Sequence, residues 1–343
     1  MNQDKIKFAV IGCGHIGKRH AEMIVRNKEA ELVALVDIKP KDSLGIDSYG
    51  AAQFFKSIEN FLASDISNEV EVVNVATPNG FHAEQAIACL EKGKHVVIEK
   101  PMALSSADAQ AVIDASDKAG KTVFCVMQNR YSPPSEWLKG IIDSGKLGKI
   151  FIVQLNCYWN RDNRYYKPES WHGKAELDGG TLYTQFSHFI DLLYWMVGDL
   201  NNIQSQMRNF NHKGLTQLKE DSGMVQFDLE DGGLGCINFS TSVWNKNLES
   251  SLTIIAENGS IKVGGQYMDK VEVCNIKDYQ MPELAPTNPG NDYGAYKGSA
   301  ANHHYVIENV IGVLKGTSPI TVNAYEGLKV VEIIERMYCK TEN

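Results

Sequence analysis

Five short apolar runs, separated by helical patterns, occupy the first 130 residues of the chain. Each run is nearly continuous in Val, Ile, Ala and Phe instead of alternating with polar residues. Strands of this kind are typical of parallel sheets that helices cover on both faces. The sequence therefore predicts a doubly wound α/β domain over residues 1–130. The runs are IKFAVIG (6–12), ELVALVD (31–37), EVVNVAT (71–77), HVVIEK (95–100) and TVFCVMQ (122–128).

A different pattern begins after residue 130. Strands follow one another with hairpin turns such as EDGG (230–233) and ENGS (257–260), in which Gly or Asn supplies the positive φ of a tight reversal. We therefore expect an α+β domain over residues 131–343 with a large, mostly antiparallel sheet. Helices near 300–315 and 323–341 are expected to close it, and the last is a candidate to pack back on the first domain. One face of so large a sheet needs a cover, so we predict a homo-oligomer, a dimer or tetramer.

Composition and charge exclude several classes of function. A formal net charge of -8 offers no basic patch for nucleic acid. The most apolar run, FIDLLYWMVG (189–198), is too short to span a membrane. The seven cysteines are scattered without a metal-ligand spacing, so we expect neither a disulfide framework nor a bound metal. The sequence thus predicts a cytoplasmic protein with no nucleic-acid or membrane partner.

A glycine pattern predicts a dinucleotide site in the first domain. Gly12, Gly14 and Gly17 form G-x-G-x-x-G between the first strand and the first helix, where a pyrophosphate approaches backbone N–H groups. Asp37 ends the second strand, and a carboxylate there accepts both ribose hydroxyls and repels a 2'-phosphate. NAD is therefore the predicted cofactor, although the nearby Lys39 leaves NADP open. The ends of later strands extend the predicted cofactor-binding set to Gly12, Gly14, His15, Ile16, Gly17, Asp37, Thr77, Pro78, Asn79, His82, Glu99, Lys100 and Gln128, with simple packing as an alternative for His82.

Two titratable side chains are candidates for catalysis. Apolar residues recur at three-and-four spacing in 179–195 and predict a helix, and His188 lies on its polar face. A histidine there is either a hydrogen-bonded core residue or a proton-transfer group, because imidazole titrates near neutral pH. Lys100 ends the fifth strand, where desolvation of its ammonium is costly without a function.

Three motifs together resemble the glucose-fructose oxidoreductase, inositol dehydrogenase and MocA family. They are the glycine turn, the tripeptide EKP (99–101) and the later helix with the pattern GG…H..D. The resemblance implies that Lys100 orients the substrate and polarises its hydroxyl, while His188 takes the hydroxyl proton as hydride leaves for NAD. Many members carry Asp at the position of Thr184. Here Thr184 or Asp191 is left as the candidate to orient the imidazole.

The resemblance extends to one branch of the family through MQNRY (127–131), residues 157–195 and ANHHYVIENVI (301–311). That branch oxidises the C3 hydroxyl of UDP-N-acetylglucosaminuronate in bacterial surface-polysaccharide synthesis. Arginine forks suit diphosphate and carboxylate oxygens, and aromatic rings suit a uracil or sugar face. The loop around residues 158–171 is alternatively a crossover that packs on another subunit. The predicted substrate-binding residues are Lys100, Asn129, Arg130, Arg161, Arg164, Tyr165, Tyr166, Trp171, Thr184, Gln185 and His188.

Two other functions remain open at this point. The first is an NAD(P)-dependent dehydrogenase of a free sugar or inositol, for which UDP does not compete with the substrate. The second is a non-catalytic NAD(H)-binding regulator, in which no substrate reduces the bound nicotinamide. Retention of both Lys100 and His188 favours an enzyme.

Overall fold

The computed structural model describes residues 5–49, 51–294, 296–339 and 341–342. The chain divides into two compact units. Unit 1 comprises Met1–Met127 and His303–Val331, and unit 2 comprises Gln128–Asn302 and Glu332–Asn343. Residues 303–331, which the sequence-based boundary at 130 assigns to the second domain, thus join unit 1, because the helix there packs on the first helix of the chain.

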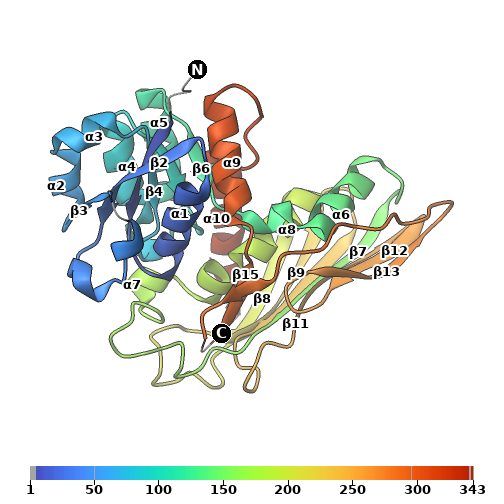
Figure 1. Cartoon of the computed structure of the whole chain (residues 1–343). Helices are drawn as coiled ribbons and strands as arrows, with labels where there is room; N and C mark the ends of the chain where they lie inside the picture. Colours follow the sequence, from blue (N-terminus) through green and yellow to red (C-terminus); the bar gives the residue numbers. More distant parts are fainter. Residues whose placement is uncertain (1–4, 50, 295, 340, 343) are drawn as a thin grey trace. The chain divides into compact units, whose positions relative to one another are not determined.

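Unit 1 contains a six-stranded parallel sheet in the order β3-β2-β1-β4-β5-β6 (Figure 1). The nearly continuous apolar runs form five of its strands, and Phe8, Val73 and Val97 are fully buried. The predicted doubly wound domain is confirmed, with a short edge strand, β3, that was not predicted. The strands are β1 (Ile6–Ile11), β2 (Ala30–Val36), β3 (Gln53–Phe55), β4 (Val72–Val75), β5 (His95–Ile98) and β6 (Val123–Cys125).

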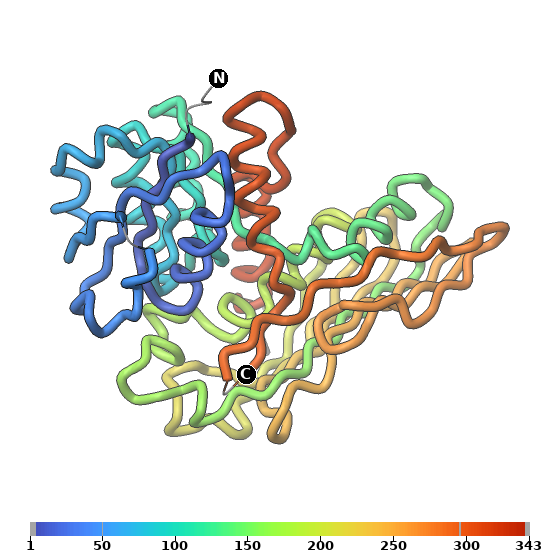
Figure 2. The backbone as a smooth tube through the Cα atoms, in the orientation of Figure 1, coloured from blue at the N-terminus to red at the C-terminus, as the bar shows by residue number. Residues whose placement is uncertain are grey.

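Helices cover this parallel sheet and bring a late segment of the chain back to it. Helix α1 packs against α9, and α4 packs against α5. Residues 303–331, the late segment that belongs to unit 1, are drawn in red in the tube of Figure 2. The helices are α1 (His15–Arg26), α2 (Ile58–Leu62), α3 (Asp65–Glu69), α4 (His82–Glu91), α5 (Ser106–Ala119), α9 (His303–Leu314) and α10 (Ala324–Cys339), with short 3-10 turns at Lys41–Ser43, Asp47–Tyr49 and Asn79–Phe81.

Unit 2 contains an eight-stranded sheet in the order β13-β12-β11-β7-β10-β9-β8-β16. Its pairs are antiparallel except β7 with β10 and β8 with β16, so the predicted, mostly antiparallel sheet is confirmed. Val153, Leu155 and Cys157 point to the buried face, which α8 covers. The strands are β7 (Ile150–Tyr158), β8 (Leu200–Arg208), β9 (Ser222–Leu229), β10 (Leu234–Ser240), β11 (Glu249–Ala256), β12 (Gly259–Gly264), β13 (Lys270–Ile276) and β16 (Thr341–Glu342).

The helix predicted over 179–195 is interrupted at its start. Residues Leu182–Phe186 form a π turn, and the regular helix α8 runs Ser187–Val197. Such turns re-aim side chains and are frequent at functional sites. The polar face of this segment is fully packed, because Thr184, Gln185, His188 and Asp191 are all buried. The other elements are the 3-10 turn η4 (Gln128–Tyr131), α6 (Pro133–Asp143), α7 (Ala175–Asp178), β14 (Gly290–Asp292) and β15 (Lys297–Ala300).

Within the described residues, no helix is both long and apolar enough to cross a lipid bilayer.

Candidate functional site

The glycine turn of unit 1 leaves room for a pyrophosphate. Gly12 has φ +86°, and a Cβ there would lie 2.6 Å from Ala76 O, while a Cβ on Gly17 would overlap Gly12 O. A Cβ on Gly14 would meet nothing within 4 Å. Two glycines therefore permit the tight packing, and the third opens space above the first turn of α1, which includes His15 and Ile16. These residues fit a dinucleotide.

Asp37 is held at the end of β2 by backbone donors. Its Oδ2 accepts a hydrogen bond of 2.7 Å from Cys13 N, and its Oδ1 accepts one of 2.8 Å from Lys39 N. A carboxylate oxygen has further lone pairs for ribose hydroxyls. The carboxylate is thus fixed beside the glycine turn, as ribose recognition requires.

The loop after β4 is fastened to the strand that carries the EKP motif. The Nδ1 atom of His82 lies 2.8 Å from Pro101 O, and its Nε2 lies 2.8 Å from Thr77 O. Burial lowers the pKa of His82, so the ring is neutral at neutral pH and its single N–H serves one carbonyl at a time. These contacts give His82 a structural role, and its cofactor role stays a prediction. Pro78 and Asn79 lie at the same turn.

Glu99 of the EKP motif lies in a buried cluster with two histidines. Its Oε1 lies 2.8 Å from His20 Nε2 and 3.6 Å from His303 Nε2, and its Oε2 accepts a hydrogen bond from Lys100 N. The three ligand-type atoms converge within 4.8 Å. Burial alone raises the pKa of the carboxyl, but the hydrogen bonds and charges of His20 and His303 outweigh it and hold the pKa well below 4.5. The cluster thereby anchors the backbone that carries Lys100.

The depressed pKa of Glu99 predicts acid sensitivity. Between the folded pKa and the usual value of 4.5 the unfolded state binds more protons, so stability present above pH 4.5 is lost as the pH falls. We expect the stability advantage of the wild type over Glu99→Gln to shrink between pH 5 and pH 3. Urea unfolding over that range measures it. A constant difference between the two proteins contradicts the assignment.

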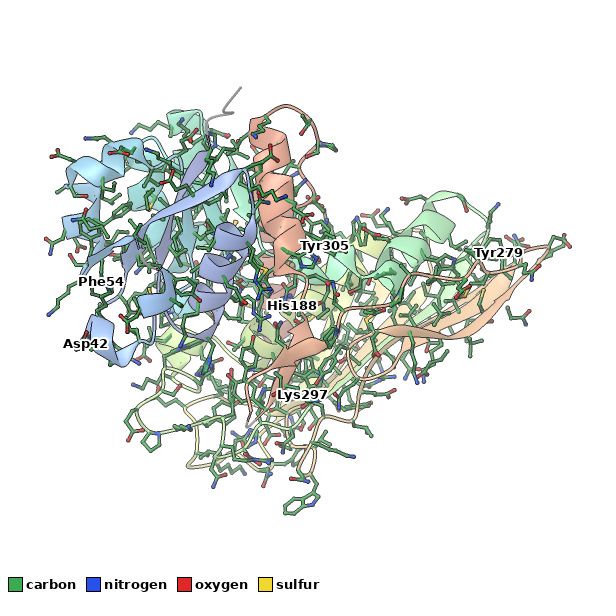
Figure 3. The ribbon with its side chains drawn as sticks, viewed as in Figure 1. Asp42, Phe54, His188, Tyr279, Lys297 and Tyr305 are labelled. Atoms are coloured by element: carbon green, nitrogen blue, oxygen red, sulfur yellow. The ribbon has the colours of Figure 1, made fainter. Side chains whose placement is uncertain are left out.

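The segment that opens unit 2 brings Gln128 to His188. The Nε2 atom of Gln128 lies 3.3 Å from His188 Nε2, and His188 is 4% exposed on α8 (Figure 3). Next to it, both polar atoms of the Asn129 amide are buried and find no hydrogen-bond partner within the described part of the chain. Buried amides are normally satisfied, so Asn129 is suited to a polar ligand.

Arg130 pairs with Asp191 in the interior. Its Nε donates to Asp191 Oδ2 at 2.9 Å, its Nη2 donates to Oδ1 at 2.6 Å, and its guanidinium lies over the ring of Trp195. Both charged side chains are at most 1% exposed. This pairing accounts for the burial of the Asp191 carboxylate. The roles of Asp191 toward His188 and of Arg130 in substrate binding stay predictions.

Arg161 is enclosed by aromatic rings. The centroids of Trp159, Tyr165 and Tyr296 lie 4.7, 5.1 and 5.1 Å from its guanidinium carbon. Its Nε donates to Gln185 Oε1 at 2.7 Å, and Gln185 Nε2 donates to Tyr165 Oη at 2.7 Å. Burial lowers the pKa of Arg161 from its ordinary value, and an arginine stays cationic at neutral pH. The structure therefore places these predicted substrate residues in one buried network.

The remaining predicted substrate residues differ in their burial and in their contacts. Thr184 Oγ1 donates to Asp178 Oδ1 at 2.6 Å, and both side chains are buried. A role of Thr184 in orienting His188 stays a prediction. Tyr166 is buried beside His212. Arg164 forms a half-exposed ion pair with Asp162, and the ring of Trp171 stacks on His172.

Two residues of the candidate site, His20 and Asp178, were not predicted from the sequence. His20 lies on the inner face of α1, three residues after Gly17, and Asp178 precedes the GG pair. No sequence pattern singles out either residue. His20 gains its partner Glu99 only when segments 79 residues apart meet, and Asp178 contacts Thr184 only because the chain turns at the glycine pair between them.

Comparison with known proteins identifies the family. The model for an oxidoreductase family with an NAD-binding Rossmann fold matches residues 6–127, and the GFO/IDH/MocA C-terminal domain matches residues 136–262. The chain belongs to this family. It is therefore an NAD-binding oxidoreductase, as the motifs predicted. The GFO/IDH/MocA fold also accounts for the sheet of unit 2.

Three relatives illustrate the range of this family. The WlbA dehydrogenase of Bordetella pertussis, solved with NADH and UDP-GlcNAcA, is 30% identical with a TM-score of 0.86 over 98% of this chain and 96% of that chain. WlbA of Chromobacterium violaceum, with the same ligands, is 31% identical with a TM-score of 0.87 over 99% and 94%. The inositol 2-dehydrogenase of Salmonella typhimurium is 31% identical over 57% of this chain. The chain matches only 55% of that enzyme's length.

The ribose carboxylate gives a prediction for cofactor choice. We expect Asp37→Ala to raise the Kd for NAD by about 10- to 100-fold, because a charge-assisted hydrogen bond contributes about 1.5–3 kcal/mol. Relative use of NADP should improve, since the repulsion of its 2'-phosphate is removed. Titration of both cofactors measures the two effects. An unchanged NAD to NADP ratio rules out the ribose role.

Proposed function

We propose that this protein oxidises the C3 hydroxyl of a UDP-N-acetylglucosaminuronate-type nucleotide sugar to the 3-keto sugar, with NAD as oxidant, in the synthesis of a bacterial surface polysaccharide. The observation that carries the proposal is the similarity over nearly the whole chain to two WlbA dehydrogenases solved with NADH and UDP-GlcNAcA. The retained Lys100 and His188 support it. A cytoplasmic location accords with substrates of this kind.

The residues divide the reaction into two tasks. NAD, when bound, supplies the acceptor for the hydride that leaves C3. The Nε2 atom of His188 accepts the hydroxyl proton, so the C–H and O–H bonds break as the C=O bond forms. The ammonium of Lys100 stabilises the negative charge that develops on the oxygen. The buried amide of Asn129 supplies hydrogen bonds to the sugar.

A panel of substrates tests this proposal against its alternatives. Absorbance of reduced nicotinamide is followed after UDP-N-acetylglucosaminuronate, UDP-N-acetylglucosamine, glucose 6-phosphate, free aldoses or inositols are added to the full chain with NAD. NADH that stays bound hides turnover, so the panel is repeated with 2-oxoglutarate as the oxidant of that NADH. Because absorbance then does not accumulate, the keto sugar itself is measured in this arm. Reduction with the uronate alone supports the proposal. Reduction with an inositol or free sugar alone contradicts it and favours the polyol dehydrogenase, and no reduction with any of them favours the regulator.

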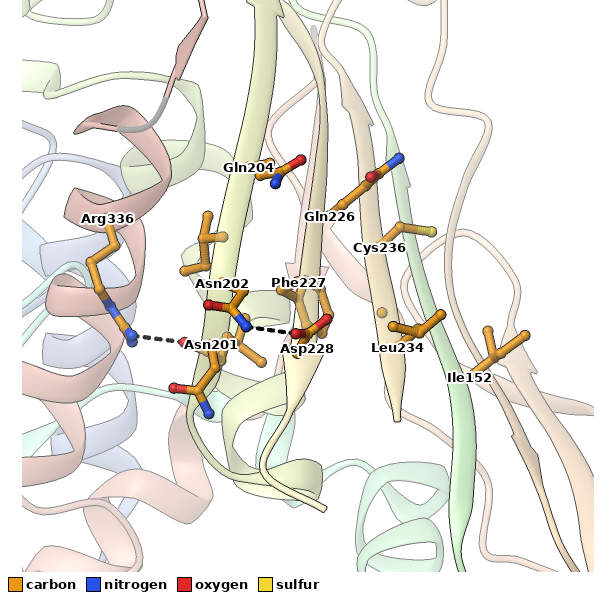
Figure 4. Close-up of a pocket in the computed structure, with 13 residues that line it drawn as sticks. Ile152, Asn201, Asn202, Gln204, Gln226, Phe227, Asp228, Leu234, Cys236 and Arg336 are labelled. Carbon is orange, nitrogen blue, oxygen red and sulfur yellow. Dashed lines mark hydrogen bonds between the residues drawn. The ribbon is translucent and has the colours of Figure 1, made fainter. Parts of the chain in front are cut away.

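We also propose that the outward face of the large sheet joins copies of the chain. Leu234 and Met224 are 61% and 59% exposed there, and apolar residues gathered on one exposed face favour a protein interface. A hollow of about 980 Å³ runs over β8, β9 and β10, and amides and aliphatic side chains line it (Figure 4). Light scattering of the purified protein should give a dimer or tetramer. A monomeric mass contradicts this proposal.

A further inference from the structure

The amide of Gln128 connects His188 to the β14–β15 pair. Its Nε2 lies 3.3 Å from His188 Nε2 and 3.0 Å from Ser299 Oγ. All three side chains belong to unit 2, and they are 3%, 4% and 5% exposed in the order Gln128, His188, Ser299. Water therefore has little access to this chain of contacts, and the amide hydrogens are directed to protein acceptors.

The available hydrogen-bond acceptors favour the orientation in which the Gln128 amide nitrogen faces His188 and Ser299. As placed, both N–H groups of Gln128 have acceptors, and its Oε1 alone lacks a partner among the described residues. Among the described residues, this orientation leaves one buried N–H, that of His188 Nδ1, without an acceptor, whereas the reversed amide leaves both N–H groups of Gln128 without one. Orphaned N–H groups are rarer than unused carbonyl lone pairs, so the orientation with fewer of them is favoured. An amide nitrogen only donates, so His188 Nε2 accepts. A neutral imidazole in that position carries its proton on Nδ1.

Other contacts hold the backbone that carries Gln128 and Ser299 independently of His188. Asn302 Nδ2 donates to Gln128 O at 3.2 Å and to Ser132 Oγ at 3.0 Å. Asn291 Nδ2 donates to Ser299 O at 2.9 Å and so fixes the other acceptor. These bonds fix the main chain at Gln128 and at Ser299, between which the side-chain amide reaches Ser299 Oγ.

We propose that Gln128 is a positioning residue that sets the tautomer of His188 and keeps Nε2 unprotonated, ready to accept a hydroxyl proton. The inference rests on the proposed function, in which His188 is the base. A contact of 3.3 Å is long for a hydrogen bond, so a substrate hydroxyl at closer range competes successfully for the same lone pair. The same contact disfavours the tautomer with the proton on Nε2, in which the ring cannot accept the hydroxyl proton at that nitrogen.

The tautomer is measured directly on the full chain with ¹⁵N-labelled histidine and no substrate. Two-bond ¹H–¹⁵N correlation distinguishes the protonated from the unprotonated ring nitrogen, and the signal lost in His188→Asn identifies the residue. We expect a protonated Nδ1 and an unprotonated Nε2. Gln128→Glu offers only acceptors, so the proton should move to Nε2. A wild-type His188 protonated on Nε2 overturns the inference.

Kinetics provide the second readout, with any substrate that the panel identifies. The carboxylate of Gln128→Glu should raise the pKa of the imidazolium and move the acidic limb of kcat/KM upward by about 1–3 pH units. The exposed Gln53→Glu is the matched control and should leave the limb in place. An acidic limb that Gln128→Glu leaves unmoved overturns the inference.

A further variant keeps the inference testable if Gln128→Glu does not fold. Gln128→Met preserves bulk and donates no hydrogen bond, so His188 should lose its preference for the Nδ1–H form. Retention of that form in Gln128→Met overturns the inference. A wild-type protein with the Nδ1–H form that oxidises no sugar contradicts the proposed function and leaves the role of Gln128 intact.

Discussion

Replacement of Lys100 by methionine is expected to lower kcat by about 10²–10⁴-fold while the Kd for NAD changes little. Methionine keeps most of the side-chain volume but removes the ammonium that stabilises developing charge on the substrate oxygen. The backbone N–H of residue 100 still donates to Glu99, so the EKP turn should remain folded. Steady-state kinetics and NAD titration measure the two quantities separately.

The matched control for this variant is Lys92→Met. Lys92 is an exposed lysine at the end of α4, away from strand ends, and its replacement should leave kcat within about twofold. Near-wild-type turnover in Lys100→Met contradicts the catalytic assignment. A large loss in both variants assigns the effect to overall charge and not to position.

Removal of the Asp191 carboxylate should destabilise unit 2 by about 3–5 kcal/mol, because Asp191→Ala leaves the Arg130 guanidinium buried without its counterion. Two charge-assisted hydrogen bonds disappear at the same time. The free energy of unfolding from urea titration, followed by tryptophan fluorescence, measures the effect, since Trp195 contacts Arg130.

An exposed ion pair of the same unit serves as the comparison. Asp143 pairs with Lys139 one turn apart on α6, and its side chain is 57% exposed. Asp143→Ala should cost less than about 1 kcal/mol, because solvent screens such pairs. Equal losses in the two variants contradict the view that burial gives the Arg130–Asp191 pair its importance.

The fold was largely predictable because periodicity and turn chemistry are local. Continuous apolar runs specified the parallel strands, and EDGG and ENGS marked the β9–β10 and β11–β12 hairpins. The three-residue strand β3 escaped because so short a segment carries no period. The π turn at Leu182–Phe186 escaped because its apolar spacing resembles that of a regular helix.

The candidate site was less predictable because it depends on pairing between distant segments. The glycine turn and Asp37 follow one another at a fixed spacing, so the cofactor half is visible in the sequence. The pairing of Arg130 with Asp191 is not visible in the sequence. Nothing in the sequence distinguishes an arginine that binds an anionic ligand from one that neutralises a buried carboxylate. The hydrogen bonds of Gln185 to Arg161 and Tyr165 were likewise not predictable from the sequence, and its role in substrate binding stays a prediction.

The most direct test of the proposed reaction follows the hydrogen at C3. UDP-N-acetylglucosaminuronate deuterated only at C3 is incubated with the full chain and NAD, and the reduced cofactor is analysed by mass spectrometry. The proposal predicts one deuterium in the reduced nicotinamide and a 3-keto sugar as product. Reduced cofactor without deuterium means that hydride comes from another carbon, and that result contradicts the assignment of the C3 hydroxyl.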